Sequence, residues 1–155
     1  MPVQTTYSQF NPVAVPGMLF DFASDAEGIV SFEAATDLPA GRFVCLDANG
    51  RAALASGSLP IIGVTVYQDT KYMPHKAGSM VPILRSGRIW AEKDVAATAP
   101  VMGAIAQRHA SNGTVVSTAG VNVVGASGYQ RGTAAQLAVP TNCALVELNL
   151  PVVTA

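Results

Sequence analysis

The stretch Ile61–Glu92, IIGVTVYQDTKYMPHKAGSMVPILRSGRIWAE, decides the fold of this chain. It begins with a run of β-branched and aromatic residues, which favour the pleated, half-buried surface of a strand. A polar loop, 68–79, separates this run from two further apolar runs, 80–85 and 88–92, which are joined by Ser86-Gly87. Short apolar runs bounded by turn residues are typical of strands rather than helices. The pattern predicts a central β-meander that closes with a hairpin at Ser86-Gly87.

Two residues of this stretch refine the prediction. Pro82 has no N–H to donate to a ladder, so we expect its strand at a sheet edge or at a bulge. Trp90 is the only tryptophan, and tryptophan usually anchors a core or an interface.

Shorter apolar runs on the N-terminal side predict more strands. The runs 18–22 and 28–33 lie around an acidic turn, 23–27. The runs 42–47 and 51–54 are joined by Ala48-Asn49-Gly50, and Asn-Gly readily takes the positive φ that a hairpin turn requires.

The C-terminal half repeats one of these patterns. The order of breaker, apolar run, Asn-Gly and apolar run occurs at 41–54 and again near 99–116, where 101–106 precedes Asn112-Gly113, which we interpret as an internal echo rather than a proven repeat. Further strands are expected at 121–125 and 142–150. The residues between them predict a loop at 126–132 and one helical turn at 133–139, closed by Pro140.

Eight to ten short strands with almost no helix predict an all-β fold, a jelly-roll-like sandwich or a β-barrel. We expect one β domain at 17–155, preceded by an extended N-terminal arm at 1–16. Three prolines in the arm fix φ and bias the preceding residues toward extended geometry. Its aromatic residues, Tyr7 and Phe10, need a surface to bury against, which is the chain's own β domain, a sister subunit or another protein.

The amino-acid composition excludes several classes of protein. The chain has 155 residues, of which 50% are hydrophobic and only 12% charged, and this excludes a disordered chain. Residues 1–50 carry a net charge of −5 and residues 51–155 a net charge of +4, but no basic patch has interleaved aromatics, so we expect no direct nucleic-acid binding. No secretory signal is visible, and no apolar run has the roughly 20 residues that span a bilayer. We therefore expect a soluble protein made in the cytoplasm, with Cys45 and Cys143 reduced.

No catalytic motif is present. Gly125-Ala126-Ser127-Gly128 has the wrong spacing for a nucleophile elbow, and there is no phosphate-binding glycine loop. The two histidines, His75 and His109, fall in predicted loops, and we interpret them as solvated. An acidic run lacks the pattern of a dedicated calcium loop and is interpreted as a solvated turn; it comprises Asp21, Asp25 and Glu27. We expect no enzyme activity, no catalytic or metal-binding residues and no cofactor.

Candidate binding residues are instead aromatic side chains and a methionine on the arm and the long loop. Tyrosine and methionine are enriched in protein interfaces. The predicted protein-interface residues are Tyr7, Phe10, Tyr67, Tyr72 and Met73.

The order of four segments resembles the capsid cement, or head decoration, proteins of tailed bacteriophages. The segments are Leu19-Phe20-Asp21, PAGRFV at 39–44, Ile62-Gly63-Val64 and GSMVPILRSGRIWA at 78–91. The likeness covers about residues 17–150, as pattern rather than identity. It implies a non-enzymatic β-barrel or jelly-roll-like protein on the outside of an icosahedral head that is built from a separate major capsid protein. It also implies a homo-oligomer, a dimer or trimer, that bridges neighbouring capsomers in the virion.

Two other function classes make different predictions. A carbohydrate- or ligand-binding β-sandwich on a virion surface requires an exposed aromatic platform, for which Tyr67, Tyr72 and Trp90 are the candidates. A small hydrolase requires His75 or His109 beside a nucleophile in space.

Overall fold

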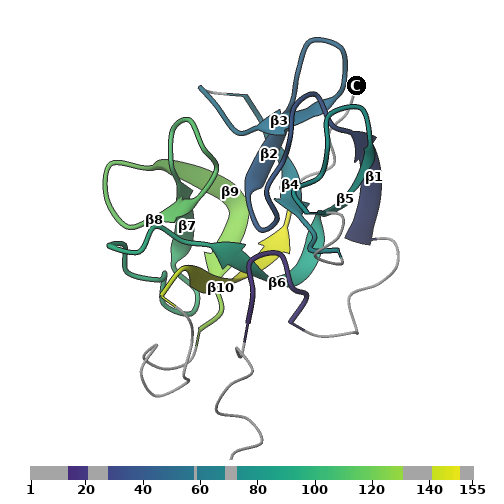
Figure 1. Cartoon of the computed structure of the whole chain (residues 1–155). Coiled ribbons are helices and arrows are strands. Elements are labelled where there is room, and N and C mark those ends of the chain that lie inside the picture. Colours follow the sequence, from purple (N-terminus) through teal and green to yellow (C-terminus); the bar gives the residue numbers. More distant parts are fainter. Residues whose placement is uncertain (1–13, 21–27, 58, 69–72, 131–140, 151–155) are drawn as a thin grey trace, which may run out of the picture.

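Two antiparallel five-stranded sheets pack face to face in the computed structural model, which describes residues 14–20, 28–57, 59–68, 73–130 and 141–150 (Figure 1). The first sheet has the order β1-β5-β4-β2-β3. Its strands are β1 (Ile29–Glu33), β2 (Phe43–Leu46), β3 (Ala52–Leu54), β4 (Ile61–Thr65) and β5 (Met80–Leu84). The second sheet has the order β6-β10-β9-β7-β8. Its strands are β6 (Ser86–Glu92), β7 (Ile105–Arg108), β8 (Val115–Val116), β9 (Val121–Gly128) and β10 (Cys143–Asn149).

The all-β prediction is confirmed, and the two sheets form a sandwich rather than a closed barrel. The described residues contain no α-helix, and hence none long and apolar enough to cross a membrane. The helical turn expected at 133–139 lies outside the described residues, as does the acidic turn at 23–27.

Both sheets have the same topology. Raising every strand number of the first sheet by five gives the strand order of the second. The β2–β4 pair has a register shift between Val44 and Cys45, and the equivalent β7–β9 pair has one between Ile105 and Gln107. The hairpin echo expected from the sequence is confirmed as β2–β3 and β7–β8, although β7 begins at Ile105 and not at the expected residue 101. It is one part of a repeat that covers both sheets.

Two glycines mark equivalent positions in this repeat. A Cβ on Gly63 in β4 would lie 2.4 Å from the carbonyl oxygen of Leu84, the last residue of β5. A Cβ on Gly125 in β9 would lie 2.6 Å from the carbonyl oxygen of Asn149, the last residue of β10. The same close approach of backbones therefore recurs in both sheets, and only glycine allows it.

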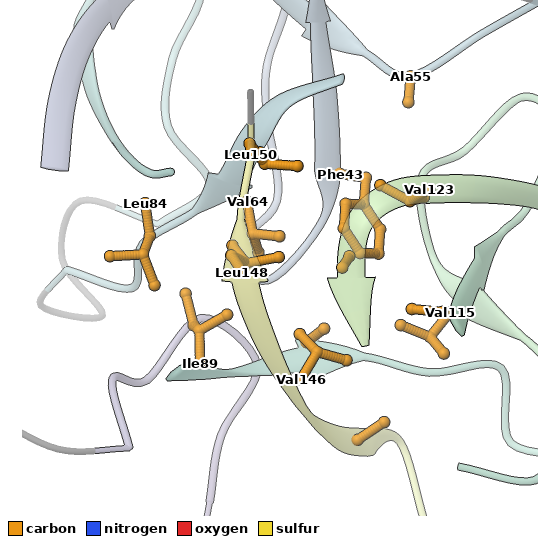
Figure 2. Close-up of a cluster of buried hydrophobic side chains, with 14 of the residues drawn as sticks. Phe43, Ala55, Val64, Leu84, Ile89, Val115, Val123, Val146, Leu148 and Leu150 are labelled. Carbon is orange, nitrogen blue, oxygen red and sulfur yellow. The ribbon is translucent and has the colours of Figure 1, made fainter. Parts of the chain in front are cut away.

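The predicted hairpin at Ser86-Gly87 is wrong. Strand β5 pairs with β4 and β1 in the first sheet, whereas β6 pairs with β10 in the second. The chain continues from one sheet into the other at Arg85, and this crossing lets Leu84 and Ile89 both point into the space between the sheets (Figure 2). The first half of the expected meander, β4–β5, is confirmed.

Pro82 does not lie on an edge strand or at a bulge, as was expected. Strand β5 lies between β1 and β4, and its register with β1 is continuous. The Pro82 carbonyl accepts a 3.0 Å hydrogen bond from the backbone nitrogen of Val66, just after β4 ends. In an antiparallel ladder the N–H and C=O of one residue point to the same side. The donor that Pro82 lacks is therefore missing only opposite Val66, beyond the last regular pair of β4.

Strand β9 continues through Ala126–Gly128, where the sequence predicts a loop. Small residues are typical of loops, but here a small residue is needed inside the strand. A Cβ on Gly128 would lie 2.2 Å from the carbonyl oxygen of Pro100. That close approach of the 100–102 segment explains why this part of the strand resembles a loop.

The main hydrophobic core lies between the sheets (Figure 2). Its large side chains include Phe43, Val64, Leu84, Ile89, Val146 and Leu148. Burying one such side chain contributes roughly 1.5–3 kcal/mol. Smaller clusters cover the outer faces: one centres on Leu38 and Ile83 on the first sheet, and the other on Trp90 and Leu145 on the second.

Candidate functional site

The segment that leads out of the predicted arm lies along the free edge of β6. The Gly17 nitrogen donates to the Trp90 carbonyl at 2.6 Å, and the Trp90 nitrogen donates to the Met18 carbonyl at 3.0 Å. Leu19 forms an antiparallel bridge with Ile89. Residues 14–20, the arm root, are therefore held on the second sheet by backbone hydrogen bonds.

Two glycines allow the arm root to approach the rest of the fold. Gly17 and Gly41 have φ of 86° and 77°, a region that favours glycine. A Cβ on Gly17 would lie 2.7 Å from the Cβ of Ala40, and a Cβ on Gly41 would lie 2.7 Å from the Gly17 nitrogen. The Gly17 carbonyl also accepts a 2.8 Å hydrogen bond from the Tyr67 nitrogen. The arm root is thus tied to the segment after β4 as well as to β6.

An open groove of about 460 Å³ lies where these elements meet. We call it the Tyr67 groove, and its lining residues are Val15, Pro16, Pro39, Ala40, Tyr67, Met73, Pro74 and Glu92. Two predicted interface residues, Tyr67 and Met73, are therefore brought together beside the arm root. The other three, Tyr7, Phe10 and Tyr72, lie outside the described residues.

An ion pair between Arg42 and Glu92 lies at one wall of the groove. The Arg42 guanidinium donates to both carboxylate oxygens of Glu92, at 2.8 and 3.2 Å. The same guanidinium donates to the Asn112 carbonyl at 3.3 Å. Because a bidentate arginine–carboxylate pair fixes the orientation of both planes, Glu92 presents a defined face to the groove.

A second group of aromatic residues was missed by the sequence analysis. The Phe20 ring lies edge-on to Trp90 and to Tyr129, with centroid distances of 6.2 and 6.0 Å. The Arg88 guanidinium lies 4.1 Å above the Tyr129 ring, within cation–π range. Phe20 remains 45% exposed, so the cluster is open to solvent on one side. No spacing along the chain signals it, because strand pairing assembles it from separate segments.

Trp90 is not part of a ligand-binding platform. Only 5% of it is exposed, and it packs with Ala14, Cys143 and Leu145 under the arm root. The exposed aromatic surface expected for a carbohydrate-binding module from Tyr67, Tyr72 and Trp90 therefore lacks its largest ring. The prediction that Trp90 anchors a core is confirmed.

The interpretation of His75 as a solvated residue is wrong. Its side chain is buried, and Nε2 lies 2.9 Å from the Val66 carbonyl oxygen. His109 is half-buried, and its Nδ1 accepts a 3.2 Å hydrogen bond from the Ser111 nitrogen. The side chains of both histidines therefore form hydrogen bonds with backbone groups of other residues in the chain.

The two cysteines are free and buried. Burial raises the pKa of the Cys143 thiol to about 11, so at neutral pH it carries its proton. Within the described ranges, no three histidine, cysteine or acidic side chains gather as metal ligands, and Asp21, Asp25 and Glu27 lie outside those ranges.

The fold is an all-β sandwich with a backbone-anchored arm root beside an apolar groove. Comparison with protein families matches residues 3–149 to the family described as structural cement protein (E217 gp24/Pam3 gp6). This chain belongs to that family of structural phage proteins and has a structural role in the phage capsid.

A chain of the solved capsid of Myoviridae phage XM1 has a similar fold. The two share 20% sequence identity with a TM-score of 0.71, over 96% of this chain and 98% of that chain. At this identity the likeness concerns the fold. A comparison with curated proteins finds no match.

Proposed function

We propose that this protein binds the outer surface of an icosahedral phage head, contacts the major capsid protein and bridges neighbouring capsomers as a homo-oligomer. The family supports a role in the shell. The observation that carries the finer proposal is the convergence of the arm root and two predicted interface residues, Tyr67 and Met73, on one open groove. A segment anchored in this way transmits tension to the β domain, because its backbone hydrogen bonds to β6 must break before it can detach.

In this proposal, two parts of the chain have different roles. Residues 1–16 form an extended arm that contacts a neighbour, and residues 17–155 form a β domain that holds the arm in place. The proposed contact residues remain Tyr7, Phe10, Tyr67, Tyr72 and Met73. Apolar and aromatic side chains of this kind form the energetic centres of protein interfaces.

Bridging stabilises a shell through linkage and multivalency. A subunit that binds the assembled lattice more tightly than free capsomers shifts the equilibrium toward the lattice. Several modest contacts in one oligomer act together, because the first contact raises the effective concentration for the next. A small groove and a short arm are therefore sufficient for a clamp when they are repeated over the head surface.

Heads stripped of this protein provide the test. They are expected to release DNA at a lower temperature than intact heads and to recover when the purified protein is added back. The variant Tyr67→Ala/Met73→Ala should restore resistance poorly. The matched control is Leu59→Ala, which removes an exposed apolar side chain outside the groove.

The location on the head is tested by cryo-electron microscopy of the same particles. Density is expected on the outer surface, across junctions between capsomers. Unchanged heat resistance of stripped heads, or density confined to a single capsomer, would contradict the bridging role.

A further inference from the structure

We propose that the free edge of β1 receives residues 3–8 of a neighbouring copy of this chain as an added antiparallel strand. This inference concerns contacts between copies and does not depend on binding to the head. It rests on the backbone geometry of β1, on the repeat within the fold and on the sequence of the arm.

The backbone groups of β1 that face outward follow from its register with β5. The Gly28 carbonyl accepts a 2.7 Å hydrogen bond from the Arg85 nitrogen, and the Ala34 nitrogen donates a 2.9 Å hydrogen bond to the Ser79 carbonyl. These bonds show which way the backbone groups of β1 point: the N–H and C=O groups of its even-numbered residues face β5, and those of its odd-numbered residues face outward. Pro82 lies opposite Ser31 and agrees with this arrangement, because at that position the β1–β5 ladder requires no N–H donor from β5. The N–H and C=O groups of Ile29 and Ser31 therefore form the open edge, which ends at Glu33, where β3 bridges the next residue.

Nothing within β1 blocks pairing at this edge. Natural edge strands are usually protected by a bulge, a proline or a lysine. The register of β1 with β5 has no bulge, and the strand sequence IVSFE contains neither proline nor lysine. Val30 is 39% exposed. Among the described residues, β3 reaches this side only where β1 ends: Ala52 forms a parallel bridge with Ala34 and accepts a 2.8 Å hydrogen bond from the Ala35 nitrogen. The edge before that bridge can accept a strand.

The equivalent edge of the second sheet, that of β6, indicates what kind of segment can pair with the edge of β1. Strand β6 occupies the position of β1 in the repeated topology, with its own partner, β10, on one side. Its other side is covered by residues 17–20, which run antiparallel to it. An extended N-terminal segment thus already caps one of the two equivalent edges.

The arm contains a second segment suited to the same task. Residues 3–8, VQTTYS, are rich in β-branched and aromatic residues, and Val3, Thr5 and Tyr7 alternate with polar side chains. The segment carries no charged side chain, and prolines at positions 2 and 12 bound it without interrupting it. Six residues are enough to cover the open part of β1, which ends where β3 bridges Ala34.

The direction of the arm root favours a neighbouring copy over the chain's own arm. From Phe20 back to Gly17 the root runs along β6 away from β1. The register places Gly17 opposite Ala91, and the chain changes sheet between Ala91 and Leu84, where pairing with β1 begins. Ser8 and Ala14 are six residues apart and reach at most about 20 Å, before any reversal of direction.

The test compares Ser31→Pro with Ser31→Ala in the full-length protein by sedimentation velocity. Ser31→Pro removes an outward N–H and leaves the hydrogen bonds between β1 and β5 in place, whereas Ser31→Ala keeps the N–H. We expect the wild type and Ser31→Ala to sediment as oligomers. Ser31→Pro and a form lacking residues 1–8 should shift to the mass of one chain. Unchanged Trp90 emission verifies that each variant is folded.

Cysteine cross-linking identifies the occupant. Separately purified Thr5→Cys and Ser31→Cys chains, mixed and oxidised, should give a disulfide-linked pair. A wild-type protein that sediments as one chain would overturn the proposal. So would an oligomer that survives both Ser31→Pro and deletion of residues 1–8, or one lost in Ser31→Pro but retained in the deletion. A cross-link formed within one chain by the double variant would show that the arm folds back on its own β1.

Discussion

The Nε2 atom of His75 lies 2.9 Å from the carbonyl oxygen of Val66. In a regular ladder that carbonyl would accept a hydrogen bond from the residue opposite, which here is Pro82 and has no N–H. Since a carbonyl only accepts, the proton of this bond belongs to Nε2. His75 is itself held by two backbone hydrogen bonds with Leu38, at 2.8 and 2.9 Å. A side chain from the long loop thus supplies the donor that a proline removes from the sheet.

Replacing His75 tests this substitution of donors. His75→Ala is expected to lower the free energy of unfolding by about 1–3 kcal/mol, because a buried carbonyl loses its partner. Adding Pro82→Val to His75→Ala should recover part of the loss, since valine restores an N–H opposite Val66. Urea unfolding of the two single variants and the double variant gives the coupling energy. Strictly additive effects would contradict a shared acceptor.

Gly17→Ala is expected to destabilise the arm root more than an ordinary positive-φ substitution does. Both the strained φ and the 2.7 Å approach to Ala40 and Tyr67 oppose a side chain at this position. Gly50→Ala is the matched control, because Gly50 has a φ of 75° with nothing within 4 Å of an added Cβ. The difference in unfolding free energy should be about 1–3 kcal/mol, the usual cost of overpacking. Equal losses for the two variants would mean that the arm root does not pack closely.

Leu148→Ala tests the core between the sheets. Leu148 is 1% exposed and packs with side chains of both sheets (Figure 2). Its truncation should cost about 2–5 kcal/mol and lower the thermal midpoint. Leu59→Ala, at a leucine that is 48% exposed, should change stability far less. Calorimetry of both variants makes the comparison, and similar midpoints would contradict a shared inter-sheet core.

The Cys143 thiol predicts a loss of stability in alkaline solution. Burial raises its pKa from 9.0 to about 11, so between these values the unfolded chain releases a proton that the folded chain keeps. Stability from this group is complete below pH 9 and falls by about 2 kcal/mol as the pH rises toward 11. Denaturant unfolding of wild type and Cys143→Ala at pH 8 and 10.5 measures the difference. A pH dependence that is identical in the two proteins would exclude Cys143 as its source.

Much of the fold follows from local sequence pattern. The apolar runs at 28–33, 42–47, 61–67 and 142–150 correspond to strands, and both Asn-Gly turns lie in hairpins. The change of sheet at Arg85 was not predictable in this way. An alternating strand that crosses between sheets has the same pattern as two strands of a hairpin, and only the pairing partners distinguish them.

The candidate site was predictable in its parts and not in its assembly. Sequence analysis identified Tyr67 and Met73, but their position beside Pro16 depends on the close approach of Gly17 to Gly41. The Phe20 cluster was missed because its members meet only when the arm root pairs with β6. His75 was misinterpreted because nothing near it in sequence reveals that the ladder lacks a donor at Pro82.

The shared topology of the two sheets has a geometric consequence. Each sheet has one face in the common core, and the strand order of one sheet repeats in the other. One polypeptide chain thus carries two sheets of the same connectivity back to back.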